Sequence, residues 1–283
     1  NPDSIQKLKE IYLNWVPCDK ILTSNLWSSE LSKLTSNAFL AQRVSSINSV
    51  SAICEATGGN VKEVAEAIGL DHRVGKLFLS PGPGFGGSCF KKDILNLVYL
   101  CKQFNLIEVA NYWQQVIILN DWQKKRIYTN IVKSLFGNLS DKKITILGFA
   151  FKSNTNDTRE SPAIQLSIDL LNEDANLIFN DPKVTKEQII EVLKNEKSNF
   201  KKYDKNLNKK LFFEQDIYKS IINSDAIILI TDWEEYTNLN WQKISNLMRK
   251  PSWVFDTRAI LDPKKVRNAG INLWQVGEGN FKR

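Results

Sequence analysis

A cysteine that could act as a nucleophile stands in the stretch SPGPGFGGSCFKKD, residues 80–93, directly after a run of glycines and prolines. Glycine costs backbone entropy, so this run indicates a close approach to the backbone or unusual torsion angles. Ser88 is predicted to cap a helix that starts beside Cys89, and Lys91 and Lys92 follow in the next turn. The positive helix N-terminus and both lysines would favour the thiolate. The alternative interpretation is a spare apolar cysteine.

The scarcity of histidine narrows the chemistry. The chain has one histidine, His72, and four cysteines without a CxxC pair. This argues against a histidine-rich metal site and against a papain-like Cys–His hydrolase. The Cys89 thiol is therefore expected to attack a carbon that is already electrophilic, such as an aldehyde. Cys54 and Cys101 lie on apolar helix faces and are interpreted as packing residues, and unpaired cysteines indicate a reduced, cytoplasmic protein.

Cationic residues follow two predicted strands in the second half of the chain. LGFAFKSNTNDTRES, residues 147–161, contains Lys152 and Arg159, which suit a phosphate or carboxylate at the end of a strand. It has one glycine where the dinucleotide fingerprint GxGxxG needs three. FDTRAIL places Arg258 at the end of another strand. The alternatives are a solvated loop and a simple Asp256–Arg258 ion pair.

Helices in the first half and alternating strands and helices in the second must position these residues. Residues 28–57 contain no Gly or Pro and predict one helix of about 45 Å, a length typical of a spine between domains or subunits. Further helices are expected after Asn60 and Ser88 and over 108–136. After Asp141, short apolar strands alternate with helices, which predicts a doubly wound parallel sheet. The helix after Ser88 is expected to bury one face, made of Ile94, Leu97, Cys101 and Phe104.

Composition and charge set the class of protein. With 283 residues, 42% of them hydrophobic, the chain is expected to form two domains. It has no apolar run long enough to span a membrane and no signal peptide, and its lack of an initiator Met predicts a fragment of a longer protein. The net charge of +7 is concentrated in residues 193–210, which read as a solvated loop rather than a nucleic-acid surface. A basic balance suits an anionic small substrate such as a nucleotide diphosphate.

Four stretches, in order, resemble one enzyme family: WSSELSKLTSNAFLAQRVSSINSVSAICEATG, GFGGSCFKKD, ILGFAFKSNTNDTRESPA and VFDTRAILD. They are similar to the UDP-glucose/GDP-mannose dehydrogenase family, most closely to its members that oxidise UDP-glucose. The resemblance covers essentially the whole chain. It implies a four-electron oxidation of UDP-glucose to UDP-glucuronate with NAD as cofactor. It also implies an α/β fold with three parts: residues 1–27, the tail of an NAD-binding domain; 28–138, a long-helix dimerisation and catalytic-loop region; and 139–283, a Rossmann-like UDP-binding domain.

The same resemblance implies a role for each catalytic position. Cys89 would attack the aldehyde intermediate and carry first a thiohemiacetal and then a thioester. Lys33 would stabilise developing oxyanion charge, with Asn37 as its hydrogen-bonding partner, and Asp93 would organise the hydrolytic water. The i, i+4 spacing places Lys33 and Asn37 on one helix face, where both can aim at one oxygen.

Binding roles are implied in the same way. The loop 78–86 would close over the sugar and nucleotide, Lys152 and Arg258 would bind the UDP part, and Arg73 would reach into a neighbouring subunit's site. Cys89, Lys92 and Arg159 would contact NAD, and no metal is expected. The full set implied for the substrate is Lys33, Asn37, Arg73, Phe78, Leu79, Gly84, Phe85, Gly86, Phe151, Lys152 and Arg258.

The chain departs from the family pattern in one respect. Neither the GxGxxG domain nor its catalytic glutamate occurs in these residues. The isolated chain is therefore expected to form a homodimer through the long helix 28–57, alone or within a hexamer, to bind UDP-sugars weakly and not to turn over. Two alternatives stay open. One is a non-catalytic nucleotide-sugar-binding or dimerisation module, and the other is a sister dehydrogenase acting on GDP-mannose or UDP-N-acetylmannosamine.

Overall fold

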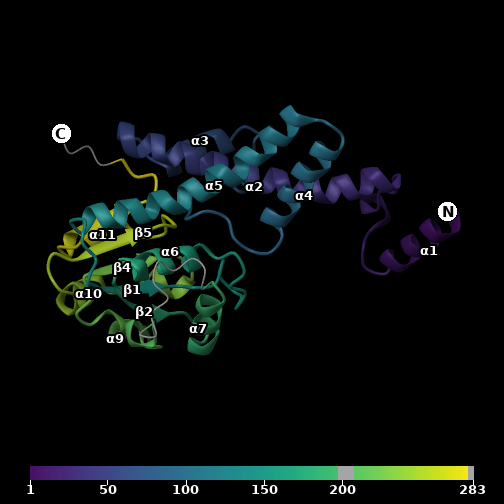
Figure 1. Ribbon diagram of the computed structural model, residues 1–283. Helices are drawn as coiled ribbons and strands as arrows, with labels where there is room; N and C mark the ends of the chain where they lie inside the picture. Colours follow the sequence, from purple (N-terminus) through teal and green to yellow (C-terminus); the bar gives the residue numbers. More distant parts are fainter. Residues whose placement is uncertain (197–206, 280–283) are drawn as a thin grey trace.

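The computed structural model describes residues 1–196 and 207–279 and has a helical part and a parallel-sheet part (Figure 1). Most of the lysine-rich segment 193–210 lies outside the described residues. The helical part consists of α1 (Pro2–Tyr12), η1 (Cys18–Lys20), α2 (Leu26–Thr57), α3 (Val61–Gly69), α4 (Phe90–Gln103) and α5 (Ile107–Ser134).

The predicted long helix is confirmed as α2, which has 32 residues. Asn25 caps its start by accepting a hydrogen bond from the Ser28 N–H at 2.8 Å, and Gly58 ends it in the left-handed conformation. α2 packs against α3, α4 and α5. Its buried face begins only at Leu34 and includes polar residues among the apolar ones: Leu34, Ala38, Ala41, Ser45, Ile47, Asn48, Ser51 and Cys54.

The predicted doubly wound sheet is also confirmed. Six parallel strands lie in the order β3-β2-β1-β4-β5-β6, which is the strand order of Rossmann folds. β1 and β4 pair at the centre, where the strand order reverses, and the carboxyl ends of such strands form the usual ligand crevice. The strands are β1 (Lys143–Leu147), β2 (Asn176–Asn180), β3 (Leu211–Phe213), β4 (Ala226–Leu229), β5 (Trp253–Asp256) and β6 (Asn272–Gln275).

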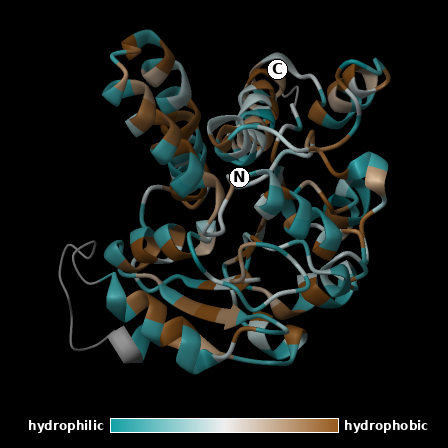
Figure 2. Cartoon of the chain, turned by 90° about the vertical axis from the view of Figure 1, so that its right-hand side faces the viewer, coloured by the Kyte–Doolittle hydropathy of each residue, from teal (hydrophilic) through white to brown (hydrophobic). Residues whose placement is uncertain are grey.

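Helices connect these strands and cover the sheet. Ser161 caps α6 by accepting from the Ala163 N–H at 3.2 Å, and Pro162 is its first residue. Figure 2 shows helices that alternate between hydrophilic and hydrophobic segments, as expected when one face packs inward. The connecting helices are α6 (Pro162–Asn172), α7 (Lys186–Asn195), α8 (Leu207–Lys210), α9 (Ile217–Ile221), η3 (Glu234–Tyr236), α10 (Trp241–Leu247) and α11 (Pro263–Asn268).

Two local predictions around α4 are wrong. Ser88 is not the cap, because Cys89 itself occupies that position and its side chain makes no capping hydrogen bond. Phe104 does not join the buried face. It lies at the end of α4, 61% exposed, with its ring against Trp27 at a centroid distance of 6.0 Å. Phe104 follows the last helical residue, so the helical spacing no longer directs its side chain.

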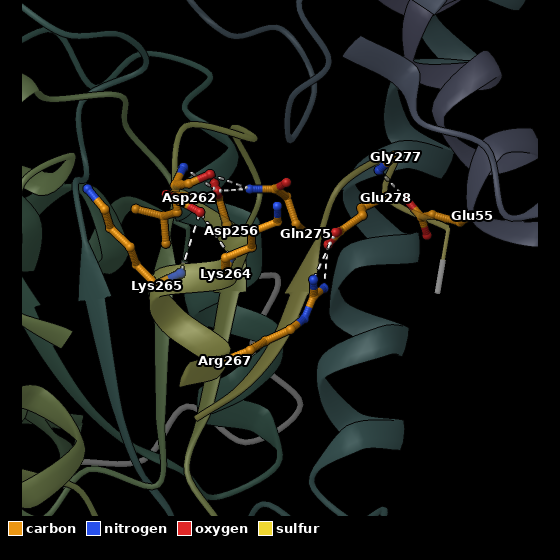
Figure 3. A network of polar contacts seen from close by, with 10 residues as sticks. Glu55, Asp256, Asp262, Lys264, Lys265, Arg267, Gln275, Gly277 and Glu278 are labelled. Atoms are coloured by element: carbon orange, nitrogen blue, oxygen red, sulfur yellow. Dashed lines mark hydrogen bonds and ion pairs between the residues drawn. The ribbon is translucent and has the colours of Figure 1, made fainter. Parts of the chain in front are cut away.

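The helical and sheet parts contact each other at two places. The last turns of α5 bury Ile127 and Ile131 in the same core as the strands. The segment after β6 also returns to the long helix: the Gly277 N–H donates to Glu55 of α2 at 2.8 Å, as Figure 3 shows. In addition, the Val61 N–H donates to the Gly277 carbonyl at 2.9 Å. The sheet is therefore attached to both ends of the region that carries Cys89.

Candidate active site

Three of the expected catalytic residues gather around one carboxylate oxygen. Lys33 Nζ and Asn37 Nδ2, one turn apart on α2, each donate to Asp93 Oδ2 on α4 at 2.5 Å. The resemblance implied a hydrogen bond between Asn37 and Lys33. In the structure Asn37 bonds to Asp93 instead. The i, i+4 spacing does aim both donors at one oxygen, and in this structure that oxygen belongs to Asp93.

Asp93 is held in its ionised form by these donors. Its side chain is buried, with 5% exposure. Burial alone would raise the pKa of Asp93, but the hydrogen bonds from Lys33 and Asn37 and the positive charges of Lys33 and Lys92 bring the pKa below its ordinary value. The Lys33 side chain is 62% exposed, so its ammonium faces solvent while it pairs with Asp93.

Cys89 lies one helical turn from this cluster. The Asp93 N–H donates to the Cys89 carbonyl at 2.9 Å, so the two residues share a face of the first turn of α4. The thiol is exposed, and its Sγ is 3.8 Å from Ser88 Oγ. Of the two lysines that follow Cys89, Lys91 pairs with Glu160 at 2.9 Å. The sulfur is accessible to a substrate.

Buried amide side chains fix the glycine-rich loop before Cys89. Asn48 of α2 accepts from the Gly82 N–H at 2.8 Å, and Gln123 of α5 donates to the Gly82 carbonyl at 2.7 Å. Asn120 accepts from the Phe85 N–H at 2.8 Å and donates to its carbonyl at 3.2 Å. Residues 81–85 are buried. This part of the loop is thus clamped between two helices.

These three amides were missed by the sequence reasoning. Each lies on a buried helix face whose other members are mostly apolar, and all three are at most 3% exposed. A polar residue that interrupts an apolar stripe needs a hydrogen-bond partner. That interruption, at Asn48, Asn120 and Gln123, was the available signal.

The glycines nearest Cys89 make room for protein rather than for substrate. A Cβ on Gly86 would lie 2.6 Å from the Glu160 carbonyl oxygen, and one on Gly87 would lie 3.1 Å from the Phe151 ring. The Gly87 N–H also donates to the Arg159 carbonyl at 2.8 Å. The loop after β1 therefore packs directly on the turn that leads into Cys89.

Arg258 lies at the carboxyl end of β5, next to the strand-order reversal. Its Nε donates to the Ile230 carbonyl at 2.6 Å and its Nη2 to the Phe151 carbonyl at 3.1 Å. Burial lowers the pKa of Arg258, against the effects of Asp232 and Asp256. The guanidinium is also 3.5 Å from the position that a Cβ on Gly82 would take.

The predicted Asp256–Arg258 ion pair is not formed. The Asp256 carboxylate instead accepts from the backbone N–H groups of Arg258 and Leu261, at 3.0 and 2.9 Å, and from Gln275 Nε2 at 2.8 Å. Figure 3 shows Asp256 and Gln275 side by side. The carboxylate thus shapes the turn that presents Arg258.

The other phosphate-binding candidate, Lys152, is exposed, with its Nζ 5.5 Å above the Phe151 ring. Phe151 therefore contacts both candidates, Arg258 through its carbonyl and Lys152 through its ring.

Two of the residues expected to contact NAD line one cleft. Lys92 and Arg159 border a volume of about 610 Å³, together with Ser88, which precedes Cys89. Arg159 pairs with Asp157 at 2.7 Å. The hydrogen bond to Asp157 and the negative charge of that residue raise the pKa of Arg159. Glu160 and Glu196 border the same cleft, so its lining carries both signs of charge.

The remaining expected substrate residues lie apart from this cluster. Arg73 is exposed, and its hydrogen bonds go to Asp71, with the closest contact at 2.6 Å. Phe78 is exposed with a positive φ of 60°, whereas Leu79 is buried. Arg43 of α2 donates to three carbonyls just before this point, those of Val74, Gly75 and Leu77.

Metal-binding clusters and membrane-spanning helices are both absent from the residues that the structure describes. Across residues 1–196 and 207–279, no group of three or more His, Cys, Asp and Glu side chains could hold a metal ion. Within the same ranges, no helix has the length and apolarity to cross a membrane.

The strand order is that of Rossmann-type α/β proteins, and Arg258 follows β5, the strand that pairs with β4 beside the reversal. Two models of one family match the chain: "UDP-glucose/GDP-mannose dehydrogenase family, central domain" over residues 27–122, and the UDP binding domain of the same family over residues 145–263. The chain belongs to the UDP-glucose/GDP-mannose dehydrogenase family.

Individual relatives agree with this assignment. The chain is 50% identical to UDP-glucose 6-dehydrogenase from Drosophila melanogaster over 275 residues, which are 97% of this chain and 57% of the relative. It is 49% identical to the enzyme of that name from Bos taurus over 277 residues, 97% of this chain and 56% of the relative. The chain thus spans a little over half the length of these curated relatives.

Solved structures have the same fold. A UDP-glucose dehydrogenase from Pyrobaculum islandicum superposes with a TM-score of 0.79 at 25% identity, covering 99% of this chain and 57% of the other. A UDP-D-ManNAc dehydrogenase from Pyrococcus horikoshii gives a TM-score of 0.76 at 24% identity, covering 98% and 58%. The second likeness, below 25% identity, concerns the fold alone.

Proposed function

We propose that this chain supplies the nucleophile and the UDP-binding domain of an NAD-dependent enzyme that oxidises UDP-glucose to UDP-glucuronate. One observation carries the proposal: Lys33, Asn37 and Asp93 meet at one oxygen, one helical turn from an exposed Cys89. The 50% identity to a UDP-glucose 6-dehydrogenase supports the choice of substrate.

The chemistry assigned to this cluster is covalent catalysis. The Cys89 thiolate adds to the aldehyde carbon of the half-oxidised sugar, and the carbonyl electron pair moves to the oxygen. Lys33 and Asn37, which now donate to Asp93, are placed to donate to that oxygen and stabilise its charge. Loss of a hydride converts the adduct into a thioester. NAD, when bound, accepts the hydride in both oxidations.

Hydrolysis completes the reaction. Water adds to the thioester carbon and the C–S bond breaks. The Cys89 sulfur is released as a thiolate, the product is a carboxylate, and the two protons of the water pass to solvent. Asp93 stays ionised because its pKa is lowered by Lys33 and Asn37 against its burial, so its carboxylate can accept a hydrogen bond from the attacking water.

Binding is assigned to cationic residues on both sides of Cys89. Arg258 and Lys152, at the ends of β5 and β1, would hold the diphosphate of UDP. Lys92 and Arg159, which border the cleft beside Ser88, would hold the pyrophosphate of NAD. Phe78, Leu79, Gly84, Phe85, Gly86 and Phe151 would form the wall around the sugar.

We further propose a homodimer that buries the exposed face of α2, as a dimer or within a hexamer. The support is a row of exposed apolar side chains on that helix: Trp27, Leu31, Phe39 and Ile53. An exposed apolar patch of this extent marks an interaction surface. Arg73 would then reach the neighbouring subunit's site. Four free thiols favour a cytoplasmic location.

Turnover is assigned to the protein that also carries the part of the relatives not matched here, since the chain spans 57% of their length. The test is NADH formation from UDP-glucose and NAD, on this chain and on a form extended upstream to the relatives' length. Cys89→Ala is the control in each. The extended form should make about two NADH per UDP-glucose, whereas Cys89→Ala should not complete the reaction and the 283-residue chain should be silent.

Other outcomes separate the alternatives. An extended form that binds UDP but oxidises no nucleotide sugar would overturn the enzyme proposal in favour of a binding module. Faster turnover of GDP-mannose or UDP-N-acetylmannosamine than of UDP-glucose would reassign the substrate.

A further inference from the structure

Phe151 touches the nucleophile's turn with its side chain. Its Cβ lies 3.0 Å from the position a Cβ on Gly86 would take, and its ring carbons lie 3.1 to 3.4 Å from the corresponding position on Gly87. Cys89 follows two residues later. Because close-packed interiors transmit displacement, the Phe151 ring and this turn cannot move independently.

The backbone of Phe151 touches Arg258. Its carbonyl accepts from Arg258 Nη2 at 3.1 Å, and its N–H donates to the Asp157 carbonyl at 3.0 Å. Arg258 also donates to the Ile230 carbonyl at 2.6 Å, so its guanidinium is fixed on the sheet. One residue thus contacts the expected diphosphate-binding arginine with its main chain and the nucleophile's turn with its ring.

The far end of the same loop holds the turn a second time. The Gly87 N–H donates to the Arg159 carbonyl at 2.8 Å, and Lys91 pairs with Glu160 at 2.9 Å. Glu160 adopts a positive φ of 54°, a conformation that costs energy in a residue with a side chain and persists only where its surroundings enforce it. The loop 148–161 therefore bonds to the start of α4 at two points, Gly87 and Lys91.

A diphosphate at Arg258 would change the contacts of Phe151. The anion would compete with the Ile230 and Phe151 carbonyls for the guanidinium donors, and it would draw Lys152 Nζ from its position over the Phe151 ring. A ligand shifts a structure only through contacts that differ between its two states, and these contacts differ. We infer that Phe151 couples occupancy of the Arg258 site by a nucleoside diphosphate to the position and reactivity of Cys89. The inference rests on the proposed function, in which Arg258 binds UDP.

The test uses the 283-residue chain and UDP, with no turnover required. Calorimetry gives the Kd for UDP, and mass spectrometry gives the rate at which iodoacetamide alkylates Cys89, with and without UDP. Cys18, which is exposed and lies before α2, is the internal reference for the reagent. In the wild type, saturating UDP should change the Cys89 rate by about fivefold or more, the lower end of ordinary coupling between sites. The Cys18 rate should stay constant.

Phe151→Leu should lose this response. It removes the ring that packs on Gly87 but keeps the Cβ beside Gly86 and the backbone carbonyl that binds Arg258. With UDP saturating according to the variant's own measured Kd, the UDP effect on Cys89 should fall below about twofold. Phe149→Leu is the matched control: Phe149 is two residues away and fully buried against Phe179, and the full UDP effect should remain.

Each remaining outcome decides the matter. If Phe151→Leu keeps the full UDP effect, UDP shields Cys89 directly and the coupling is wrong. If the wild type binds UDP without any change at Cys89, the coupling is again wrong but the UDP site stands. If UDP does not bind at all, the proposed function fails as well. Should circular dichroism show that the Leu variant is unfolded, Phe151→Met, which conserves volume, is judged by the same criteria.

Discussion

The cation near Cys89 and the cation at the sheet are held in opposite ways. Lys33 is bonded by another side chain, Asp93, across two helices, and it stays largely exposed. Arg258 is bonded by the main-chain carbonyls of Ile230 and Phe151 and is half-buried. The first arrangement depends on the identity of three side chains. The second depends on where the fold places its backbone, and so on residues that hold a turn rather than on residues that touch the ligand.

The largest expected effect comes from removing the residue that shapes the arginine's turn. Asp256 is fully buried and accepts from two backbone N–H groups and from Gln275. Asp256→Ala leaves these donors unsatisfied, so the free energy of unfolding should fall by about 3–5 kcal/mol in urea denaturation. UDP affinity of the folded fraction should fall too, because Arg258 loses its fixed turn.

Asp262→Ala is the control for this change, and both residues are seen in Figure 3. Asp262 is exposed and caps α11 by accepting from the Lys264 N–H at 2.9 Å. The cost should be about 1 kcal/mol, with UDP affinity unchanged. Equal losses in the two variants would show that Asp256 is only another cap.

Gly86→Ala disturbs the packing between the turn before Cys89 and the loop that carries Phe151. The new Cβ would lie 2.6 Å from the Glu160 carbonyl, so either the loop or the turn must shift. We expect a loss of about 1–3 kcal/mol in stability and, in the extended protein, a loss of kcat, because the turn before Cys89 and the loop that carries Phe151 can no longer pack as they do.

Gly59→Ala is the matched control for that variant. Its added Cβ would meet Cys54 Sγ at 3.4 Å, an ordinary contact. Gly59 follows the end of α2. Stability and activity should change little. If Gly86→Ala behaved like Gly59→Ala, the tight packing against Glu160 would not position Cys89.

Asp93→Asn tests the side-chain arrangement through its pH dependence. Lys33 and Asn37 lower the folded-state pKa of Asp93 against its burial. A depressed carboxyl pKa stabilises the fold above the unfolded value, near pH 4, and this contribution disappears as the pH falls through the folded value. At pH 7 the variant should be less stable by about 1–3 kcal/mol, and the two proteins should converge towards pH 3.

Asp71→Asn provides the comparison for a surface carboxylate. Its pKa is also lowered, by hydrogen bonds from Arg73, but this pair is exposed. Its pH-dependent contribution should be small and should vanish in high salt, because solvent and ions screen it. A salt-insensitive difference between wild type and Asp93→Asn, measured by urea denaturation from pH 3 to pH 7, supports the buried cluster.

How far the sequence could go differs between these regions. Helical spacing was sufficient to place Lys33 and Asn37 on one face of α2, because that relation is local. It could not show that both donors meet Asp93, since this depends on how α2 packs on α4. Likewise, glycine at Gly86 and Gly87 signalled a close approach, but the approaching group, Phe151, is more than sixty residues away.

The same division holds in the fold. The alternation of strands and helices predicted a doubly wound sheet, and the structure confirms it. β3 was missed because three residues, Leu211–Phe213, carry too little pattern to distinguish a strand. The cap at Ser88 was misplaced by one residue, which is the ordinary uncertainty of a helix boundary. Asn48 and Gln123 interrupt apolar stripes that the sequence shows, but that both bond to Gly82 of the loop follows only from how the helices pack.

The smallest effect on stability is expected for Arg73→Ala, since its side chain is exposed and bonds to Asp71 two residues away. The melting temperature should not change measurably. In the extended, active protein, however, turnover should fall if Arg73 completes a neighbouring subunit's site. Mixing the Arg73→Ala and Cys89→Ala variants tests whether Arg73 acts in its own subunit's site or in its neighbour's. In a mixed dimer, the intact Cys89 of one subunit meets the intact Arg73 of its partner, so a 1:1 mixture of dimers should recover about a quarter of wild-type activity. No recovery on mixing would place Arg73 outside its neighbour's site. The Lys33 cluster and the Arg258 turn would then suffice within one chain.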